Sequence, residues 1–449
     1  MQLTVEQASS LAPNANTLKR AQKLAKPASF KNAGANERAV WAAVKGSGSD
    51  YQTFVDLEGI AYKCSCPVHN HPCKHALSLM LFAAAQSLPD HNLPDELQTW
   101  LNKRDAAKTR KENKTSEVKD PKAQAKRLKE RENKVKQGII ELEHFLEDAV
   151  RMGLGELAKR KEDSWDKIQR RLIDAQAKGL ATRIDWMRQQ MRYQPHWTEA
   201  VFQALLELHL LISAYHHQDK LSPEFAADVR EYVGWNRTKD QILSPDTQFE
   251  NWLVLNQAIR YESGLYIQSI WLQHLTKHNI ALVRNFAVPQ SRESLSGGYL
   301  AGSVIEAKVD YYSTHFPLRA LVERKSNFEQ RNFTTKEWQN LEQNAFANLD
   351  TAIRYARDCQ CKNPFLHEIP LIINNLRLVM KGDVVTFADS DNRLLALNRD
   401  FNQTWQLLSL MGVENACVFL IFDGKTAKPW ALAQNGVWQA FDMNEGEDE

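Results

Sequence analysis

The chain has 449 residues, a length that suggests about three domains of 150 residues each. Hydrophobic residues make up 43% and charged residues 25%, and the mean hydropathy is −0.50, which is typical of globular proteins and excludes a disordered or fibrous chain. The longest nearly apolar run, residues 76–85, is far shorter than the roughly 18 residues that a membrane-spanning helix needs. The first ten residues lack the basic start and apolar core of a secretory signal, so we expect a cytoplasmic protein.

The net charge of +2 is distributed unevenly along the chain. Residues 103–136 contain 14 Lys and Arg against 6 Asp and Glu, a net charge of +8, whereas residues 137–449 carry a net charge of −7. Because phosphate attracts cations irrespective of sequence, non-specific contact with a nucleic acid should centre on the basic segment. The acidic remainder would on average repel a nucleic acid.

Three short strands are predicted near the beginning of the chain. Residues 39–44, 51–57 and 60–64 are rich in Val, Trp, Tyr and Phe and are separated by glycine-containing turns. Residues 72–86 follow as a helix, because a proline in the first turn precedes a run of Ala and Leu. We therefore expect a small ββα-like module within an N-terminal domain of residues 1–101.

A basic arm and a helical region are expected next. Residues 102–136 alternate Lys, Arg, Glu, Ala and Gln with almost no large apolar side chains, which predicts a solvated linker that buries no face of its own. Residues 137–244 form the expected helical region, in which residues 139–220 carry apolar side chains at helical spacing and are interpreted as three or four helices packed on one another.

The C-terminal part, residues 245–449, alternates strand-like and helix-like patterns. Segments 252–261 and 265–272 flank a short turn, and one long helix is expected over residues 335–358. Because hairpin-like spacing favours antiparallel pairing, we expect an antiparallel α+β body rather than a doubly wound sheet. The predicted fold class is therefore multidomain α+β, with the small module, the basic linker, the helical region and this body in order.

The most informative feature is a cluster of cysteines at the start of the first predicted helix. Cys64 and Cys66 are two residues apart, so on a strand both thiols point to one face and can reach the same ion. Cys73 and His75 lie at the helix start, where exposed backbone N–H groups favour the thiolate. Three thiolates and an imidazole form a closed tetrahedral set, which is typical of structural zinc and leaves no position for a catalytic water.

This arrangement resembles the SWIM zinc finger, in which Cys-x-Cys is followed, after a variable gap, by Cys-x-His and an apolar helix. The resemblance covers residues 38–86 and implies one bound zinc ion held by Cys64, Cys66, Cys73 and His75. Such modules occur in bacterial proteins, chromatin remodellers and transposases, which implies DNA binding or protein–protein contact. Bacterial proteins of this size with the module are often encoded beside AAA+ ATPases and von Willebrand A-type proteins, so the resemblance also implies an assembly of that kind.

Two other histidines lie in the loop between the cysteine pairs. Either His69 or His71 could replace His75 as the fourth ligand. We assign His75, because it occupies the helix start that the family pattern requires.

Two further patterns carry chemically active residues. Cys359 and Cys361 could form a second metal site with His367, but at this spacing on a helix the two thiols point about 200° apart. Residues 306–310 place a Glu, a Lys and an Asp on one face of a predicted strand, as in half of a metal-dependent nuclease site, although any half-buried strand shows this alternation. The sequence contains no phosphate-binding glycine loop, dinucleotide fingerprint or nucleophile elbow, so we expect a protein that is not an enzyme.

Two functional hypotheses follow. In the first, the zinc module and the basic arm bind DNA or RNA while the C-terminal body contacts a protein partner; the expected phosphate contacts are Lys126, Arg127, Lys129 and Arg131. In the second, the protein is purely a protein-interaction adaptor, with an AAA+ ATPase as a possible partner. Salt dependence separates the two, because phosphate contacts make affinity fall steeply as salt rises.

Overall fold

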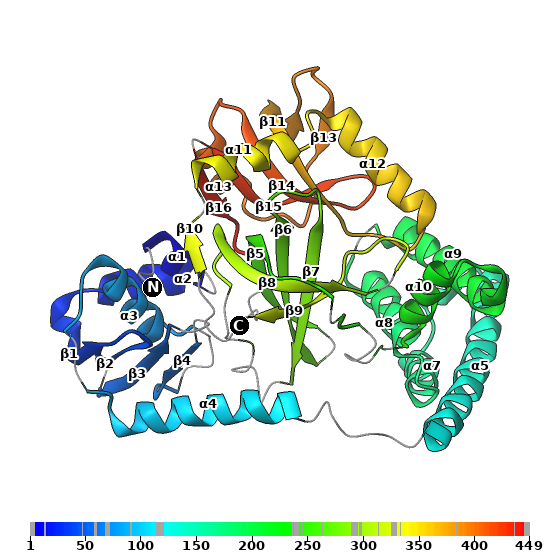
Figure 1. Cartoon of the computed structure of the whole chain (residues 1–449). Coiled ribbons are helices and arrows are strands. Elements are labelled where there is room, and N and C mark those ends of the chain that lie inside the picture. The colour runs from blue at the N-terminus through cyan, green and yellow to red at the C-terminus, as the bar shows by residue number, and fades with distance from the viewer. Residues whose placement is uncertain are drawn as a thin grey trace.

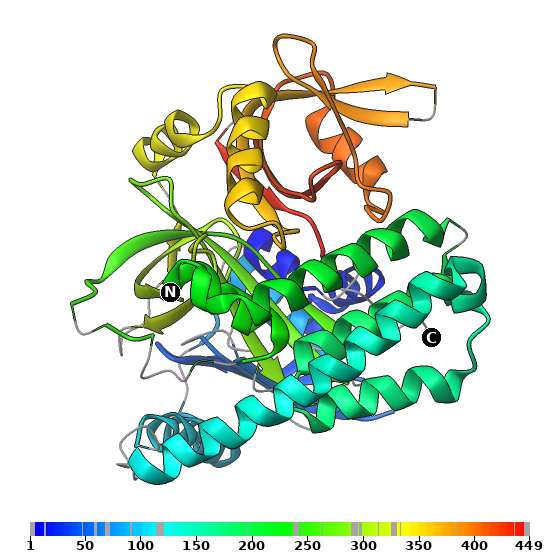
Figure 2. The same ribbon diagram turned by 90° about the vertical axis from the view of Figure 1, so that its right-hand side faces the viewer.

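The computed structural model describes the chain from residue 5 to residue 443 with short gaps. The residues that it does not describe are 1–4, 13–14, 47, 58–60, 68–71, 90–91, 114–120, 195, 236, 238–241, 245, 263, 289–294, 296–298, 313, 325–329, 333, 383, 435 and 444–449. Three antiparallel sheets and a bundle of helices make up the described part, which confirms the multidomain α+β fold class (Figures 1 and 2). In Figure 1 the N-terminal module lies on the left, the helical bundle on the right, and the two C-terminal sheets between and above them.

The N-terminal module is a four-stranded sheet with helices on both faces. In sheet order the strands are β1 (Phe30–Ala35), β2 (Ala39–Lys45), β3 (Asp50–Asp56) and β4 (Ala61–Cys64). Helix α3 (Lys74–Ala85) packs on the face that carries Val40, Val44 and Val55. Two further helices contact α3, namely α1 (Val5–Ser10) and α2 (Ala15–Leu24), and a short 3-10 turn, Pro27–Ser29, precedes β1. The three predicted strands and the predicted helix are thus present, with β1, α1 and α2 in addition.

Helix α4 (Asp95–Asn113) covers the opposite face of this sheet, along the lower edge of Figure 1. Its Leu97 and Leu101 pack against Trp41 and Phe54, which alternate with the residues facing α3. Because both sheet faces are buried, the strands are apolar on both sides, as β2 shows over almost its whole length. The helix continues through the predicted domain boundary at residue 102.

The helical bundle is formed by six consecutive helices. They are α5 (Pro121–Met152), α6 (Leu154–Ala158), α7 (Glu162–Asp174), α8 (Lys178–Tyr193), α9 (Trp197–His216) and α10 (Pro223–Val233), with a 3-10 turn at Gln218–Lys220. Their buried apolar side chains form one core, which α5 enters at Val135. The turns of α5 before that point extend beyond the packed part of the bundle.

The first C-terminal sheet closes into a barrel. Its strands are β5 (Glu250–Glu262), β6 (Leu265–His274), β7 (Ile280–Ala287), β8 (Ser303–Tyr311), β9 (Ala320–Arg324) and the short β10 (Gln330–Asn332). Antiparallel ladders join β7 to β6, β6 to β5, β5 to β8 and β8 to β9. Leu282 of β7 then forms a parallel bridge with Arg319 and donates its N–H to the Leu318 carbonyl at 2.7 Å, so the circular order is β5-β6-β7-β9-β8. A bulge between Val254 and Asn256 lets the long strand β5 bend around the barrel.

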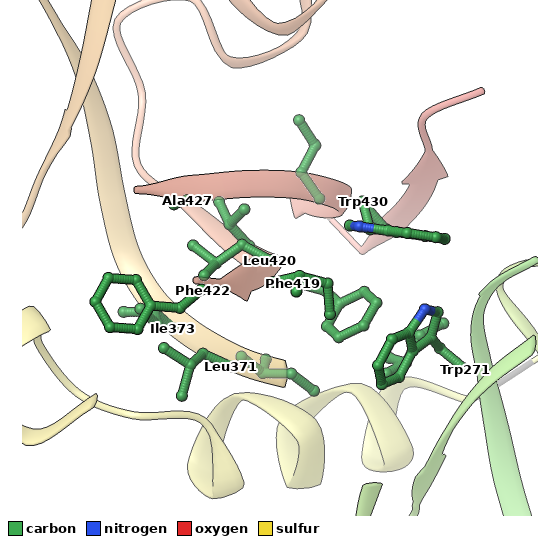
Figure 3. Packing of buried hydrophobic residues seen from close by; sticks show 14 of the residues in the cluster. Trp271, Leu371, Ile373, Phe419, Leu420, Phe422, Ala427 and Trp430 are labelled. Atoms are coloured by element: carbon green, nitrogen blue, oxygen red, sulfur yellow. The ribbon is translucent and has the colours of Figure 1, made fainter. Parts of the chain in front are cut away.

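The second C-terminal sheet packs on the outside of the barrel. In sheet order its strands are β13 (Leu394–Ala396), β12 (Val384–Ala388), β11 (Ile369–Lys381), β14 (Ala416–Phe422), β15 (Ala427–Gln434) and β16 (Val437–Ala440). The accompanying helices are α11 (Thr335–Asn344), α12 (Leu349–Lys362) and α13 (Thr404–Met411). Trp271 of β6 meets Phe419 and Trp430 edge to face, with ring centroids 5.8 and 6.0 Å apart (Figure 3). These aromatic contacts join the two sheets through one apolar core.

The single helix predicted over residues 335–358 is wrong, because the structure divides it into α11 and α12. Between them, Phe346 donates its N–H to the Ile372 carbonyl and accepts the N–H of Asn374, which extends the edge of β11. The Asn348 side chain then caps α12, because its Oδ1 atom accepts the backbone N–H of Thr351 at 3.0 Å. Local helix propensity is overridden here by pairing with a strand that follows later in the chain.

Candidate metal centre

The four predicted zinc ligands come from the end of β4 and the start of α3. Cys64 is the last residue of β4, and Cys66 follows two residues later. Cys73 is the N-cap residue of α3 in an extended conformation, and its Sγ accepts the Ala76 N–H at 3.4 Å. His75 is in the first turn of the same helix and is buried. The strand end and the helix start therefore aim all four side chains at one point.

The geometry of the cluster fits a tetrahedral zinc ion. The four ligand atoms all lie within 4.8 Å of one another, and the Nδ1 atom of His75 lies 3.9 Å from the Sγ atoms of both Cys64 and Cys73. Zinc–sulfur and zinc–nitrogen bond lengths place neighbouring ligand atoms of a tetrahedral site about 3.5–3.8 Å apart. The four predicted ligands are thus brought together around a volume that suits one structural zinc ion.

The imidazole of His75 is fixed from both sides. Its ring centroid lies 4.8 Å from that of Tyr51, which belongs to β3. The Nδ1 atom faces the sulfur atoms, while the buried Nε2 atom has no hydrogen-bond partner among the described residues. The ring therefore presents Nδ1 as its ligand atom.

The electrostatics of the cluster favour a cation. Hydrogen bonds from Cys73, His75 and Thr53 lower the pKa of Cys64 to about 4. The pKa of Cys73 is raised, first by its contact with the Cys64 sulfur and second by burial. A divalent cation in the cluster would stabilise both sulfur atoms as thiolates.

Two residues that contact the zinc ligands lie outside the Cys-x-Cys and Cys-x-His pattern, so the pattern does not predict them. The register of the β3–β4 ladder pairs Thr53 with Cys64, and the Thr53 hydroxyl lies 3.3 Å from the Cys64 Sγ. Tyr51, two residues earlier, points to the same face of β3 and reaches His75. The predicted strand over 51–57 places both side chains on one face by its alternation, but only the register of the β3–β4 ladder shows that this face meets the zinc ligands.

The four predicted phosphate contacts divide into two groups. Lys126, Arg127 and Lys129 lie exposed near the beginning of α5 and form no ion pair with any described residue. Arg131 is half-buried instead: its guanidinium lies 4.3 Å from the ring of Trp235, and it donates a 2.9 Å hydrogen bond to a backbone carbonyl of the bundle.

The histidines proposed as alternative zinc ligands, His69 and His71, lie outside the described residues. Cys359 and Cys361 both lie on α12, where Cys359 is buried and Cys361 is exposed. His367 lies 3.0 Å from a carboxylate oxygen of Glu207 in the bundle. Among the residues that the structure describes, the four zinc ligands are the one group of three or more side chains that could hold a metal ion.

The residues of the nuclease-like pattern serve other contacts. Glu306 is exposed, and Lys308 lies 3.9 Å from Glu323 on the neighbouring strand. Asp310 is buried and accepts hydrogen bonds from the Ser244 N–H and the Thr247 hydroxyl, which attach the segment before β5 to the barrel. No helix in the described part of the chain combines the length and apolar character needed to cross a bilayer.

Comparison with known proteins identifies two domains. Residues 51–84 match the family model of the SWIM zinc finger, which covers β3 to α3 with all four ligands. Residues 130–233 match the SWIM-associated four-helix bundle domain, which corresponds to the packed part of the bundle.

No curated protein matches the chain. Among solved structures, a chain from "Structure and Conformational Change of a Replication Protein A Heterotrimer Bound to ssDNA" matches with 11% sequence identity and a TM-score of 0.23. The match covers 43% of this chain and about half, 51%, of that chain, and its TM-score is too low to indicate a common fold. The two family matches and the ligand geometry show that this chain contains a SWIM zinc finger, whose ligands suit one structural zinc ion, followed by a SWIM-associated four-helix bundle domain.

Proposed function

We propose that this protein binds nucleic acid without being an enzyme, with the zinc finger as a structural domain and the basic arm as the source of phosphate contacts. The observation that carries the proposal is the exposure of Lys126, Arg127 and Lys129 on turns of α5 that precede the packed part of the bundle. Exposed cations without acidic partners can exchange their counterions for phosphate at little cost.

The zinc site supports a structural role for the finger. Bound zinc would supply folding free energy by crosslinking β4 to α3 through Cys64, Cys66, Cys73 and His75. Four protein ligands leave no open coordination position for a water nucleophile, which is the reason for proposing a protein that is not an enzyme.

The path of α4 supports joint action of finger and arm. Arg38 of the finger forms a bidentate pair with Asp105 of α4, at 2.8 and 3.0 Å. The buried carboxylate of Asp56 lies 3.2 Å from Arg104 of α4 and 3.7 Å from Arg38. These pairs fix the beginning of the arm on the zinc finger, and they occupy Arg38 and Arg104, which are therefore not counted as phosphate contacts.

The test is a salt titration of binding to a labelled DNA duplex by the full chain. Replacing Lys126, Arg127 and Lys129 together by Gln should weaken binding to all sequences alike and flatten the log–log salt slope by up to about 0.9 per residue. The matched control replaces Lys161, Lys167 and Lys178, which are exposed on the bundle, and should leave the slope unchanged despite the same loss of charge. Equal binding by the arm variant and the wild-type chain would contradict the proposal.

A protein-interaction adaptor is the second candidate, and one observation favours it. Phe202, Leu206 and Leu210 follow one another at four-residue spacing along α9 and are about half exposed, at 52%, 52% and 47%. Such a stripe suits contact with another protein. If the assembly with an AAA+ ATPase implied by the family resemblance exists, Leu206→Ser with Leu210→Ser should abolish co-purification of the two proteins and leave DNA binding unchanged.

A further inference from the structure

The strand order of the closed barrel is one that many ligand-binding proteins share. If β5, β6, β7, β8 and β9 are numbered 1 to 5, the circular order is 1-2-3-5-4, with strands 3 and 5 parallel where they meet. This is the topology of the OB-fold, whose outer surface on the second and third strands binds oligonucleotides and oligosaccharides in many proteins. Topology alone assigns no function, so the residues on that surface must decide.

The ladder between β6 and β7 defines which residues lie on the outer surface. Ile270 and Val283 are paired and face the barrel interior, where they belong to its core. The alternate pairs therefore face outward, and these are Trp271 with Leu282, Ser269 with Arg284, and Ile267 with Phe286. The second sheet covers the first of these pairs, as the packing of Trp271 in Figure 3 shows, and leaves the other two outside that core.

The part of this surface that lies outside that core combines an aromatic ring with arginines. Phe286 is 49% exposed although it lies within a regular strand. The guanidinium of Arg319 lies 5.9 Å from its ring centroid, and Arg284 lies two residues away on the same face. An exposed ring offers a stacking surface for a base, and neighbouring guanidinium groups suit the phosphates on either side of that base.

Two carboxylates hold these arginines in place. Glu368, between α12 and β11, lies 2.5 Å from Arg284, and Glu231 of α10 lies 2.6 Å from Arg319. Both ion pairs are partly exposed to solvent, so a phosphate can compete for the guanidinium groups. The net charge of −7 over residues 137–449 gives no indication of this local cluster.

We propose that the outer surface of β6 and β7 binds single-stranded nucleic acid, with a base stacked on Phe286 and its phosphates bound by Arg284 and Arg319. A single strand is required because the bases of a duplex are already stacked on one another and cannot reach the ring. The site is separate from the basic arm and uses a different kind of contact, so it goes beyond the function proposed above.

The experiment measures binding of fluorescein-labelled oligothymidylate, about 20 nucleotides long, to the full chain with Lys126, Arg127 and Lys129 already replaced by Gln. In this background Phe286→Ala should weaken binding about tenfold, and Phe286→Trp should retain it, because stacking on an aromatic ring contributes strongly for each base. Phe202→Ala is the matched control, since Phe202 is exposed to a similar degree, at 52%, but lies on α9 of the helical bundle and not on the barrel.

Two charge variants test the phosphate contacts. Glu368→Gln should tighten binding, because it releases Arg284 from its ion pair, and Arg284→Gln should lower the salt slope by about 0.7.

Wild-type affinity in Phe286→Ala, or an equal loss in Phe202→Ala, would overturn the proposal. Full displacement of the oligonucleotide by inorganic polyphosphate, with no effect of Phe286→Ala, would likewise show a surface that binds anions but does not recognise bases. Because the arm is neutralised throughout, these results do not depend on whether the arm binds DNA.

Discussion

Tyr51 and Thr53 show how residues outside the zinc motif shape the metal site. Both lie on β3, one strand away from the first cysteine pair, and each contacts a different ligand. The Thr53 hydroxyl lies 3.3 Å from the Sγ of Cys64 and also 3.2 Å from the Tyr51 carbonyl. A hydroxyl that donates to a metal-bound thiolate stabilises its negative charge and orients it, as outer-shell groups do in metal sites generally.

Replacing Thr53 by Val should therefore weaken zinc binding while the fold is retained. The substitution keeps the shape of the side chain and removes the hydrogen bond to Cys64, and we expect the zinc affinity to fall about 10- to 100-fold. Competition with a chromogenic chelator measures this change directly. Thr386→Val is the control, because Thr386 also lies on a strand and donates to a backbone carbonyl, but far from the zinc ligands in the chain. Unchanged zinc affinity in Thr53→Val would show that the hydroxyl serves only the backbone.

The ligands could be predicted from the sequence, whereas their supporting residues could not. The four ligands lie within twelve residues, so their spacing and chemistry alone indicate one site. Thr53 and Tyr51 come to the site only through the register between β3 and β4 and the packing of α3 on the sheet. Register depends on which face is buried, and one sequence without its structure leaves that choice open.

At the level of the elements, α5 and α10 are joined around the indole of Trp235. The guanidinium of Arg131 on α5 lies 4.3 Å from the centroid of the Trp235 ring, and the guanidinium of Arg230 on α10 lies 4.0 Å from it. Glu132 connects the same two helices to α9, because it accepts from the Tyr215 hydroxyl at 2.8 Å and from Arg230 at 3.1 Å. These contacts mark the point at which α5 changes from an exposed arm into part of the bundle.

Arg131→Gln should destabilise the bundle, in contrast to the same change at Arg127. The Arg131 variant loses a cation–π contact and a charged hydrogen bond at a partly buried position, which we expect to cost about 1–2 kcal/mol. Arg127 is exposed one turn earlier on the same helix, so its replacement should change stability by less than about 0.5 kcal/mol. Chemical denaturation of the two full-length variants measures both values, and equal effects would contradict the assignment of Arg131 to the bundle.

Helices and hairpins were predictable where the periodicity is local, but closure of the barrel was not. The hairpin of β5 and β6 follows from two strand-like segments around a short turn. The bridge between Leu282 and Arg319 is parallel and joins residues far apart in the chain, so no turn residues between them predict the pairing. The helix break at Phe346 has the same origin, since it depends on pairing beside β11.

At the scale of the whole molecule, three joints between parts each include an apolar side chain of one part that is buried in the core of another. Leu300, just before β8, belongs to the core under α3 of the zinc finger. Trp271 of the barrel is shared with the second sheet, and Phe365, after α12, is buried in the helical bundle. Phe365 stacks on Phe225 with centroids 6.2 Å apart. The parts are therefore packed on one another, and a substitution at one joint should lower the free energy of unfolding of the whole chain.

The joint between the bundle and the C-terminal body also contains a buried acid. Asp228 of α10 is only 4% exposed and accepts hydrogen bonds from the His315 N–H at 3.0 Å and the Asn363 side chain at 3.2 Å. Burial raises the pKa of Asp228, and the hydrogen bonds and the charge of Arg237 oppose this while the charge of Glu231 adds to it, which leaves the pKa at about 6. The folded protein thus holds this proton more tightly than the unfolded chain does.

Asp228→Asn should therefore become more stabilising as the pH rises. In the wild-type chain the contribution of Asp228 is most favourable below about pH 4 and declines as the pH rises through about 6, because the buried carboxyl must then ionise. Asparagine can still accept both hydrogen bonds and cannot ionise. Scanning calorimetry from pH 4 to pH 7 should accordingly show a melting temperature of the variant that rises by several degrees relative to the wild-type chain.

Asp174→Asn, at an exposed position on α7, is the control and should give a melting temperature that differs from the wild-type value by a constant amount over the same range. Parallel curves for Asp228→Asn and the wild-type chain would mean that Asp228 is ionised in the folded protein throughout and that the joint tolerates its charge.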